Sequence, residues 1–321
     1  MLLGANFFWG LSFPLIKTLA LLQERLLPGV GTWFSGIYTV APRFLLATAV
    51  LVAFQARDFW KITRGELTQG VIIGLFAAAG MLFQTDGLQF TAASTSAFLT
   101  QFYAIMIPVY LALRARRSPR ITVWISCALV LAGIAILGRF DFATLSLGRG
   151  EWETLLSSVF FMGQILWLEK PEYAANRPEK LTLVMFATEA VIFWTLAGIV
   201  APDTNALFAP WLSSSWVLLT VLLTLVCTVG AYMIMNTWQP KITATEAGLI
   251  YCFEPIFGSG MALFLPGIFS MWAAINYANE TATVNLFIGG GLITAANILI
   301  QLNPPPRPTI ASSSGSSAQA G

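Results

Sequence analysis

The stretch Gly87–Leu113 (GLQFTAASTSAFLTQFYAIMIPVYLAL) decides the fold, because it has no charged side chain and is bounded by Asp86 and Arg114. An apolar helix needs about 20 residues to cross a bilayer. Other long uncharged stretches occur at Thr204–Pro240, Pro255–Asn279 and Thr281–Pro306. A soluble helical bundle would carry a polar stripe on each helix, and these stretches carry none. The sequence therefore predicts an all-α integral membrane protein.

Composition leads to the same prediction. Of 321 residues, 57% are hydrophobic and only 10% are charged, against about 25% charged in an ordinary soluble domain. The net charge of +2 gives no basis for a nucleic-acid partner. The chain has no histidine, which removes the usual general base and the commonest metal ligand. Its three cysteines are scattered in apolar segments, so we expect packing residues, no disulfide or zinc site, and no cofactor.

Apolar runs bounded by charges, proline or glycine predict about ten transmembrane helices. They cover residues 2–22, 37–56, 68–88, 92–113, 121–138, 152–169, 181–200, 215–237, 244–265 and 283–302. A signal peptide is the competing interpretation of the first run, but Met1–Gly10 has no basic stretch. The tail, residues 303–321, is rich in proline, then serine, glycine and alanine, so we expect it to be disordered.

Lysine and arginine are unevenly distributed between the predicted loops, which sets the orientation. With a cytoplasmic N-terminus, only Arg25, Arg139 and Arg149 face out. Twelve basic residues then lie on the cytoplasmic side: Arg57, Lys61, Arg64, Arg114, Arg116, Arg117, Arg120, Lys170, Arg177, Lys180, Lys241 and Arg307. We therefore expect a multi-pass protein of the cell (inner or plasma) membrane with both termini in the cytoplasm.

The two halves of the chain resemble each other at an offset of about 150 residues. Phe7–Gly10 (FFWG) is echoed by Phe160–Gly163 (FFMG), and Ala128–Gly138 resembles Gly291–Gln301. Four further residues of the first half, Gln89, Thr95, Ala97 and Leu99, recur as Gln239, Thr245, Ala247 and Leu249. Five helices per half is an odd number, so the second half inserts upside down. The pattern predicts two inverted five-helix repeats, residues 1–138 and 152–302, joined by a linker at 139–151.

Several motifs resemble the drug/metabolite transporter superfamily, EamA-type. They are Trp9–Lys17 (WGLSFPLIK) in the first helix, Pro42-Arg43-Phe44 in the second, Gly87–Leu99 followed by Pro108, and Thr245-Glu246-Ala247 with Glu254-Pro255 in the ninth. The resemblance spans residues 2–302 and implies ten helices in two inverted repeats that move metabolites, amino acids or drugs, often outward. The chain departs from the family after the ninth helix, where the connection Pro266–Ala282 carries Glu280 as its single charge.

Four charged residues lie inside predicted helices, where a charge costs about 2.5–3.5 kcal/mol and must face protein or water. Lys17 could bind substrate or extend to the outer interface, and Arg43 could bind an anion or reach the headgroups. Glu189, near the middle of its helix, could pair structurally or relay protons. Glu254 precedes Pro255, which interrupts a helix, and is the leading candidate for substrate binding, with helix packing as its alternative.

Uncharged polar and aromatic residues could line the same cavity, since a small-molecule site combines apolar walls with a few polar groups. The candidates are Trp9, Gln101, Tyr103, Gln164 and Tyr251. Two glycine-rich patterns, Gly70-Gly74-Ala78 and Gly289–Gly291, are typical of close helix packing.

A secondary transporter of a small solute that works by alternating access accounts for these features, and the family resemblance implies efflux. No Walker sequence is present, so a gradient would supply the energy. A polytopic membrane enzyme, a channel or a non-transporting membrane protein are the alternatives. We expect a small-molecule solute and the lipid bilayer as partners, and the sequence leaves a homodimer open.

Overall fold

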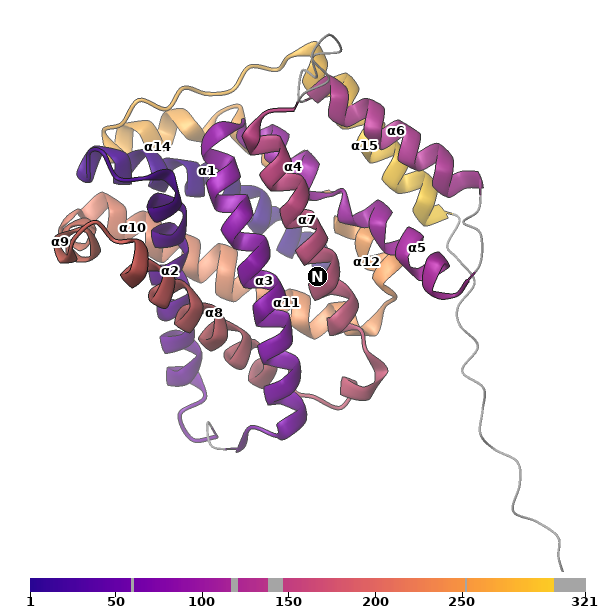
Figure 1. Ribbon diagram of the computed structural model, residues 1–321, viewed down its shortest axis with the longest axis horizontal. Helices are drawn as coiled ribbons and strands as arrows, with labels where there is room; N and C mark the ends of the chain where they lie inside the picture. The colour runs from indigo at the N-terminus through magenta and orange to yellow at the C-terminus, as the bar shows by residue number, and fades with distance from the viewer. Residues whose placement is uncertain (59–60, 117–120, 138–146, 252, 303–321) are drawn as a thin grey trace, which may run out of the picture.

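The protein is a bundle of helices, and the computed structural model describes residues 1–58, 61–116, 121–137, 147–251 and 253–302. No strand occurs in these ranges (Figure 1). The helices of the first half are α1 (Leu2–Leu26), α2 (Thr32–Phe54), α3 (Arg64–Phe90), α4 (Ala93–Thr100), α5 (Tyr103–Arg114) and α6 (Ile121–Leu137). Those of the second half are α7 (Arg149–Leu168), α8 (Pro178–Val200), α9 (Thr204–Phe208), α10 (Ser214–Leu222), the π-helix η4 (Leu223–Gly230), α11 (Ala231–Trp238), α12 (Ala244–Tyr251), α13 (Glu254–Ala262), α14 (Leu265–Ala273) and α15 (Val284–Leu302).

Several of these helices are long and apolar enough to cross a membrane. In the described ranges six segments meet this criterion, namely α1, α2, α3, α4–α5, α8 and α10–α11, and a seventh if α13 and α14, bent by 57°, form one span. Shorter apolar helices lie within α6 and α15. The predicted crossing 152–169 corresponds to α7, which is not among the six. The chain is therefore a multi-pass helical membrane protein, while the count of ten crossings stays a prediction.

Three boundaries differ from the sequence-based prediction. α2 begins at Thr32 rather than at residue 37. The predicted helix 244–265 is divided into α12 and α13, and the connection after it contains a helix, α14. The predicted linker 139–151 lies mostly, and the predicted tail 303–321 entirely, outside the described residues.

The helices pack in a pattern that treats the two halves alike. α2 packs on α8 and α6 on α15, and each of these pairs joins elements at the same place in the two halves (Figure 1). Other contacts come in matched sets: α4 packs on α13 as α12 packs on α5, and α1 packs on α13 as α7 packs on α5. Likewise, α3 packs on α7 as α11 and η4 pack on α1, so these contacts recur when the two halves are exchanged.

Small residues allow α3 to approach α8 closely, as the glycine pattern predicts. A Cβ atom at Gly70 would overlap Val184, and one at Gly74 would overlap Thr188. The packing role of this stripe is thus confirmed.

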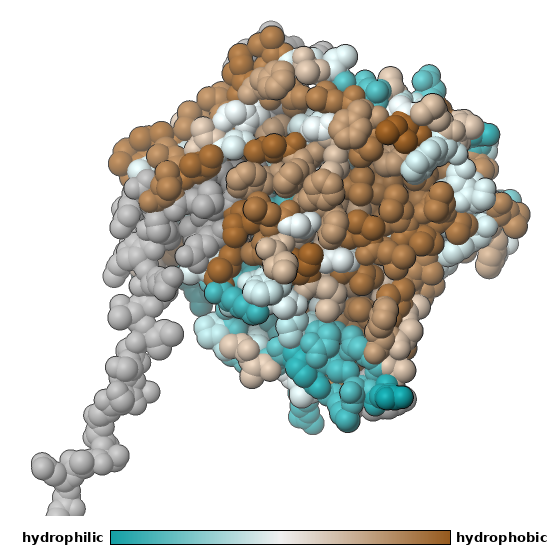
Figure 2. Space-filling model, turned by 180° about the vertical axis from the view of Figure 1, so that it is seen from behind, coloured by the Kyte–Doolittle hydropathy of each residue, from teal (hydrophilic) through white to brown (hydrophobic). Residues whose placement is uncertain are grey.

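The outer surface of the bundle is largely apolar. Figure 2 shows a broad hydrophobic face, with hydrophilic residues gathered at one end. Large side chains within the candidate spans are exposed, among them Leu45, Leu75, Val191, Leu218 and Leu225. A soluble monomer rarely exposes apolar patches of this extent, so this surface fits contact with lipid.

Candidate functional site

Two interrupted helices meet at the centre of the bundle. α4 ends at Thr100 and α5 begins at Tyr103, while α12 ends at Tyr251 and α13 begins at Glu254. α4 packs on α13, and α5 packs on α12. Within a membrane, non-helical backbone is tolerated only where it is buried in protein or lines a cavity. The two interruptions therefore mark the place where a site can form.

Gln101 and Glu254 connect the two interruptions directly. The Gln101 side-chain amide donates a hydrogen bond of 3.1 Å to the Glu254 carboxylate, and both side chains are buried. Glu254 was expected in the middle of a helix but lies in the first turn of α13. The partial positive charge of a helix N-terminus stabilises a carboxylate there. Pro255 is compatible with this position because the first turn of a helix needs no amide donor.

A small cavity of about 50 Å³ adjoins this junction. It is lined from both halves of the chain, by residues of α1, α3, α4 and α5 and by residues of α7, α11, α12 and α13. Five of the predicted site residues line it: Trp9, Tyr103, Gln164, Tyr251 and Glu254. Lining residues that the sequence-based prediction missed include Ser12, Met81, Gln84, Thr100, Phe161 and Tyr232.

The cavity wall combines aromatic rings with few polar groups. Trp9 packs edge-on against Tyr232 and Tyr251, with ring centroids 5.5 and 5.6 Å apart. The Tyr251 hydroxyl donates to Gln239 at 2.9 Å. Two buried polar atoms have no hydrogen-bond partner, the indole nitrogen of Trp9 and the amide oxygen of Gln101. One donor and one acceptor at the site are thus unsatisfied within the protein.

Arg43 and Glu189 lie behind the cavity wall rather than in it. Arg43 is 1% exposed and Glu189 is 0% exposed. The Arg43 guanidinium donates to the Thr228 hydroxyl and approaches the sulfur of Met81, a residue of the cavity wall. The expectation that Arg43 could reach the headgroups is wrong, because α2 begins five residues earlier than predicted and places Arg43 deeper in the bundle.

Lys17 does not reach the cavity. Its ammonium group donates to the backbone carbonyl of Thr91, just after the end of α3. The Thr91 hydroxyl in turn donates to Glu151 at 2.6 Å. Lys17 thus belongs to contacts between the ends of helices.

Two acidic residues have roles that the sequence-based prediction did not assign. Asp86 is fully buried in α3 and forms an ion pair with Arg149 of α7. Glu280 accepts hydrogen bonds from the Ala93 and Ser94 amides at 2.8 and 3.3 Å, so it caps the N-terminus of α4. Asp86 is the one acidic residue of the predicted helix 68–88, and this could have drawn attention to it. Its partner Arg149, however, is 63 residues away in the sequence.

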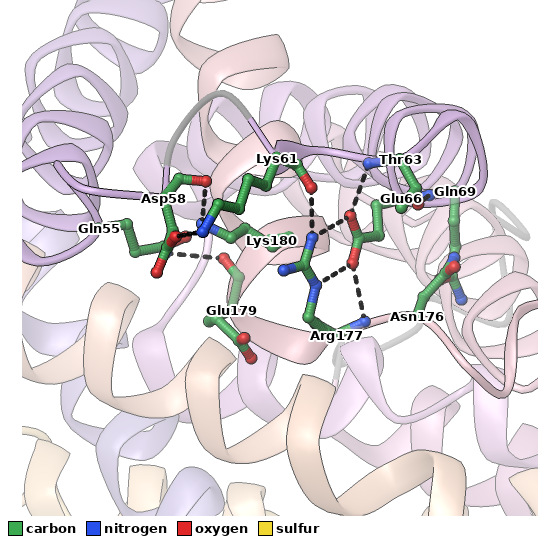
Figure 3. Close-up of polar contacts among 10 residues, drawn as sticks. All are labelled: Gln55, Asp58, Lys61, Thr63, Glu66, Gln69, Asn176, Arg177, Glu179 and Lys180. Carbon is green, nitrogen blue, oxygen red and sulfur yellow. Dashed lines mark hydrogen bonds and ion pairs between the residues drawn. The ribbon is translucent and has the colours of Figure 1, made fainter.

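A polar cluster ties the two halves together at one end of the bundle (Figure 3). Arg177 donates to both carboxylate oxygens of Glu66, at 2.7 and 3.0 Å, and this hydrogen bonding raises the pKa of Arg177. The backbone amides of Thr63 and Arg177 also donate to Glu66. Nearby, a hydrogen bond from Lys61 lowers the pKa of Asp58, and Lys180 donates to the Asp58 carbonyl at 2.8 Å. The cluster joins the α2–α3 connection to the start of α8.

The described residues contain no group of three His, Cys, Asp or Glu side chains that could hold a metal ion. The arrangement that they do contain is a largely apolar cavity with a few polar groups, lined from both halves of a bundle in which several helices are long enough to span a membrane. It defines a multi-pass helical membrane protein with an internal cavity.

Comparison with known proteins relates the first part of the chain to a transporter family. Residues 1–139 match the EamA-like transporter family, which is part of the drug/metabolite transporter superfamily. A comparison with curated proteins found no match. Among solved structures, one titled only "Crystal structure of protein" is 16% identical, with a TM-score of 0.57. The alignment covers 92% of this chain and 95% of that one, so the shared fold extends well beyond the first half.

Proposed function

We propose that this protein is a secondary transporter that exports a small solute by alternating access. The hydrogen bond between Gln101 and Glu254 carries the proposal, because it joins two interrupted helices from different halves beside the cavity. Transporters place their sites near the bilayer midplane, where discontinuous helices of the two repeats meet. The match of residues 1–139 to the EamA-like transporter family supports the same class.

The two halves act as inverted five-helix repeats in this proposal. Support comes from the packing pattern, in which α2–α8 and α6–α15 pair corresponding elements and the contact of α4 with α13 recurs as that of α12 with α5. A rocking motion of one half against the other would then expose the cavity alternately to the two sides. The excess of lysine and arginine on one set of loops supports cytoplasmic termini, and we propose the plasma membrane as the location.

The residues that line the cavity suggest which chemical groups the solute carries. Glu254 is the one charged residue among the described lining residues, and it can accept hydrogen bonds or balance a positive charge. The rings of Trp9, Tyr232 and Tyr251 offer apolar faces, and aromatic faces attract cations. The proposed solute therefore carries an amine or another hydrogen-bond donor next to an apolar part.

An enzyme and a channel are less well supported. Among the described lining residues of the cavity, Glu254 is the only acid, so no pair of acids there could act as acid and base on one substrate. The cavity is lined by helices of both halves of the chain, as a site for alternating access requires. Transport is thus the function that the geometry supports best.

The test begins with the solute. Solutes released by cells that express the protein are compared with those released by cells that lack it, and the enriched compound is then used in proteoliposomes. Glu254→Gln is expected to abolish flux of that compound, because the amide cannot carry the negative charge. Glu24→Gln is the matched control, since Glu24 is an exposed residue of the same α1 that lines the cavity. Equal flux in wild type and Glu254→Gln would remove Glu254 from the site.

A further inference from the structure

Glu189 of α8 and Arg43 of α2 are buried near each other without being bonded. Neither carboxylate oxygen of Glu189 has a hydrogen-bond partner. No contact of 4.0 Å or less joins this carboxylate to the Arg43 guanidinium. Arg43 nevertheless lies near Glu189, because α2 packs on α8 and the ring of Phe44, the residue after Arg43, lies 5.5 Å from that of Phe186, three residues before Glu189. The two groups are close enough to interact electrostatically. The two groups are thus an ion pair that is open in this conformation.

An open pair of this kind is unfavourable if Glu189 is ionised. An isolated carboxylate in an apolar environment costs far more free energy than a neutral polar group. A carboxylate that remained charged here would be expected to bond to the nearest donor. The geometry fits a neutral carboxylic acid instead.

The surroundings of Glu189 contain few groups that could exchange a proton with it. α2 contributes Arg43, α11 contributes the hydroxyl of Tyr232, and η4 contributes Cys227 beside Arg43. The titratable residues of α3 lie at its ends, and those of α8 other than Glu189 lie in its first turn. These terminal residues are Arg64, Glu66, Asp86, Glu179 and Lys180.

We propose that Glu189 is a proton-binding site, separate from the solute cavity, at which a bound proton is exchanged for an ion pair with Arg43. When the proton leaves the carboxyl group for water, the remaining carboxylate accepts hydrogen bonds from the guanidinium. When a proton returns, the ion pair opens and the conformation described here is restored. The O–H bond of the carboxyl group is the one covalent bond that is formed or broken, and no electron is transferred.

The contacts of Arg43 show how this exchange can be linked to movement. Its partner Thr228 lies in the π-helix η4, and the Thr228 hydroxyl also bonds to the Leu223 carbonyl at 3.0 Å. π-helical turns inside α-helices are frequently found at functional sites. Arg43 also contacts Met81, which lines the cavity. Closing the ion pair would withdraw Arg43 from both contacts and alter η4 and the cavity wall together.

This inference rests on the proposed function only for its consequence, namely that the proton gradient drives solute transport. The binding of the proton can be tested without any solute. Infrared spectra of the purified protein, in lipid at neutral pH, report protonated carboxylic acids by their carbonyl stretching band. We expect such a band in the wild type, its loss in Glu189→Gln, and its retention in Glu66→Gln, where the changed carboxylate is bonded to arginine.

A second variant keeps the test informative if Glu189→Gln fails to fold. Glu189→Asp keeps the acid and is expected to shift the band in frequency rather than remove it. A spectrum with no component that responds to either change at position 189 would overturn the proposal. If the band is present but no solute is transported, the proton site stands and the proposed function fails; transport without the band gives the reverse conclusion.

Discussion

Two buried carboxylates of the same residue type, Glu66 and Glu189, have opposite surroundings. Glu66, in the polar cluster at the end of the bundle, accepts hydrogen bonds from two backbone amides and from two nitrogens of Arg177 (Figure 3). Glu189, in the middle of α8, accepts none. Each carboxylate has an arginine nearby, Arg177 for Glu66 and Arg43 for Glu189. The two sites therefore differ in whether the arginine is hydrogen-bonded to the carboxylate.

The comparison distinguishes a carboxylate that its partners hold in one charge state from a carboxylate that can gain or lose a proton. A carboxylate whose acceptor sites are filled is fixed in charge and position, and removing its partner leaves a buried charge unpaired. A carboxylate without partners has nothing to lose on protonation, and it can gain an ion pair if the helices move. Glu254, with one donor from Gln101, lies between these two cases.

The largest effect on stability is expected from Arg177→Met, which removes two of the donors to Glu66. The Glu66 side chain is only 2% exposed, so water can replace little of what is lost. We expect the free energy of unfolding to fall by about 2–3 kcal/mol. Thermal unfolding in detergent measures the change.

The control for this variant is Lys61→Met in the same cluster. Lys61 pairs with Asp58, but the two side chains are 70% and 52% exposed. An exposed ion pair contributes at most about 1 kcal/mol. Equal losses in the two variants would show that burial does not distinguish Glu66 from a surface acid.

A smaller loss is expected from Arg149→Met. Asp86 is fully buried, but only one of its oxygens is bonded, and Arg149 is 44% exposed. We expect the free energy of unfolding to fall by about 1–2 kcal/mol. Arg149 also pairs with Glu153 at 2.7 Å, so the variant leaves two carboxylates without their partner. Adding Asp86→Asn should recover part of the loss, because the more deeply buried of these two charges is then removed. A further loss in the double variant would contradict the assigned pair.

The sequence predicted the helices well because hydropathy alone determines them. Apolar runs bounded by charges, proline or glycine place α1, α3, α8 and the α4–α5 segment within a few residues of the structure. The interruption between α4 and α5 has no such signal, since Gln101-Phe102 lies inside the uncharged run Gly87–Leu113 and its proline, Pro108, comes six residues later. The break before Glu254 was indicated by Pro255, although the helix ends before the proline rather than bending at it.

The site was predictable as a set of residues and not as an arrangement. Trp9, Gln164 and Glu254 were selected because polar or aromatic groups inside apolar helices need a reason to be there. Their convergence depends on contacts between distant parts of the chain, such as Gln101 with Glu254 at a separation of 153 residues. Lys17 was selected for the same reason but lies away from the cavity, because its ammonium group donates to the backbone carbonyl of Thr91 near the end of α3.

Gln101→Met tests Glu254, the buried carboxylate that is intermediate between Glu66 and Glu189 in its hydrogen bonding. It removes the one hydrogen bond to Glu254 and keeps a side chain of similar volume, so we expect a loss of about 1 kcal/mol in stability. Solute flux should fall by more than this loss explains, because Glu254 is no longer held towards α4. Gln84→Met is the control, since Gln84 bonds to Thr100 in the same cavity wall at 3.0 Å. Flux reduced equally in both variants would assign the effect to the wall in general.

The smallest effect is expected from Glu189→Gln, and it tests the comparison most directly. If Glu189 is a neutral acid without partners, the amide replaces it with nearly the same size and no lost bond, and the free energy of unfolding should change by less than about 0.5 kcal/mol. The same substitution at Glu66 removes a charge that two nitrogens of Arg177 hold, and should cost about 2–3 kcal/mol. Thermal unfolding of the two variants at neutral pH gives the difference. A large loss for Glu189→Gln would mean that its negative charge already balances Arg43, and the two regions would then differ in geometry but not in charge state.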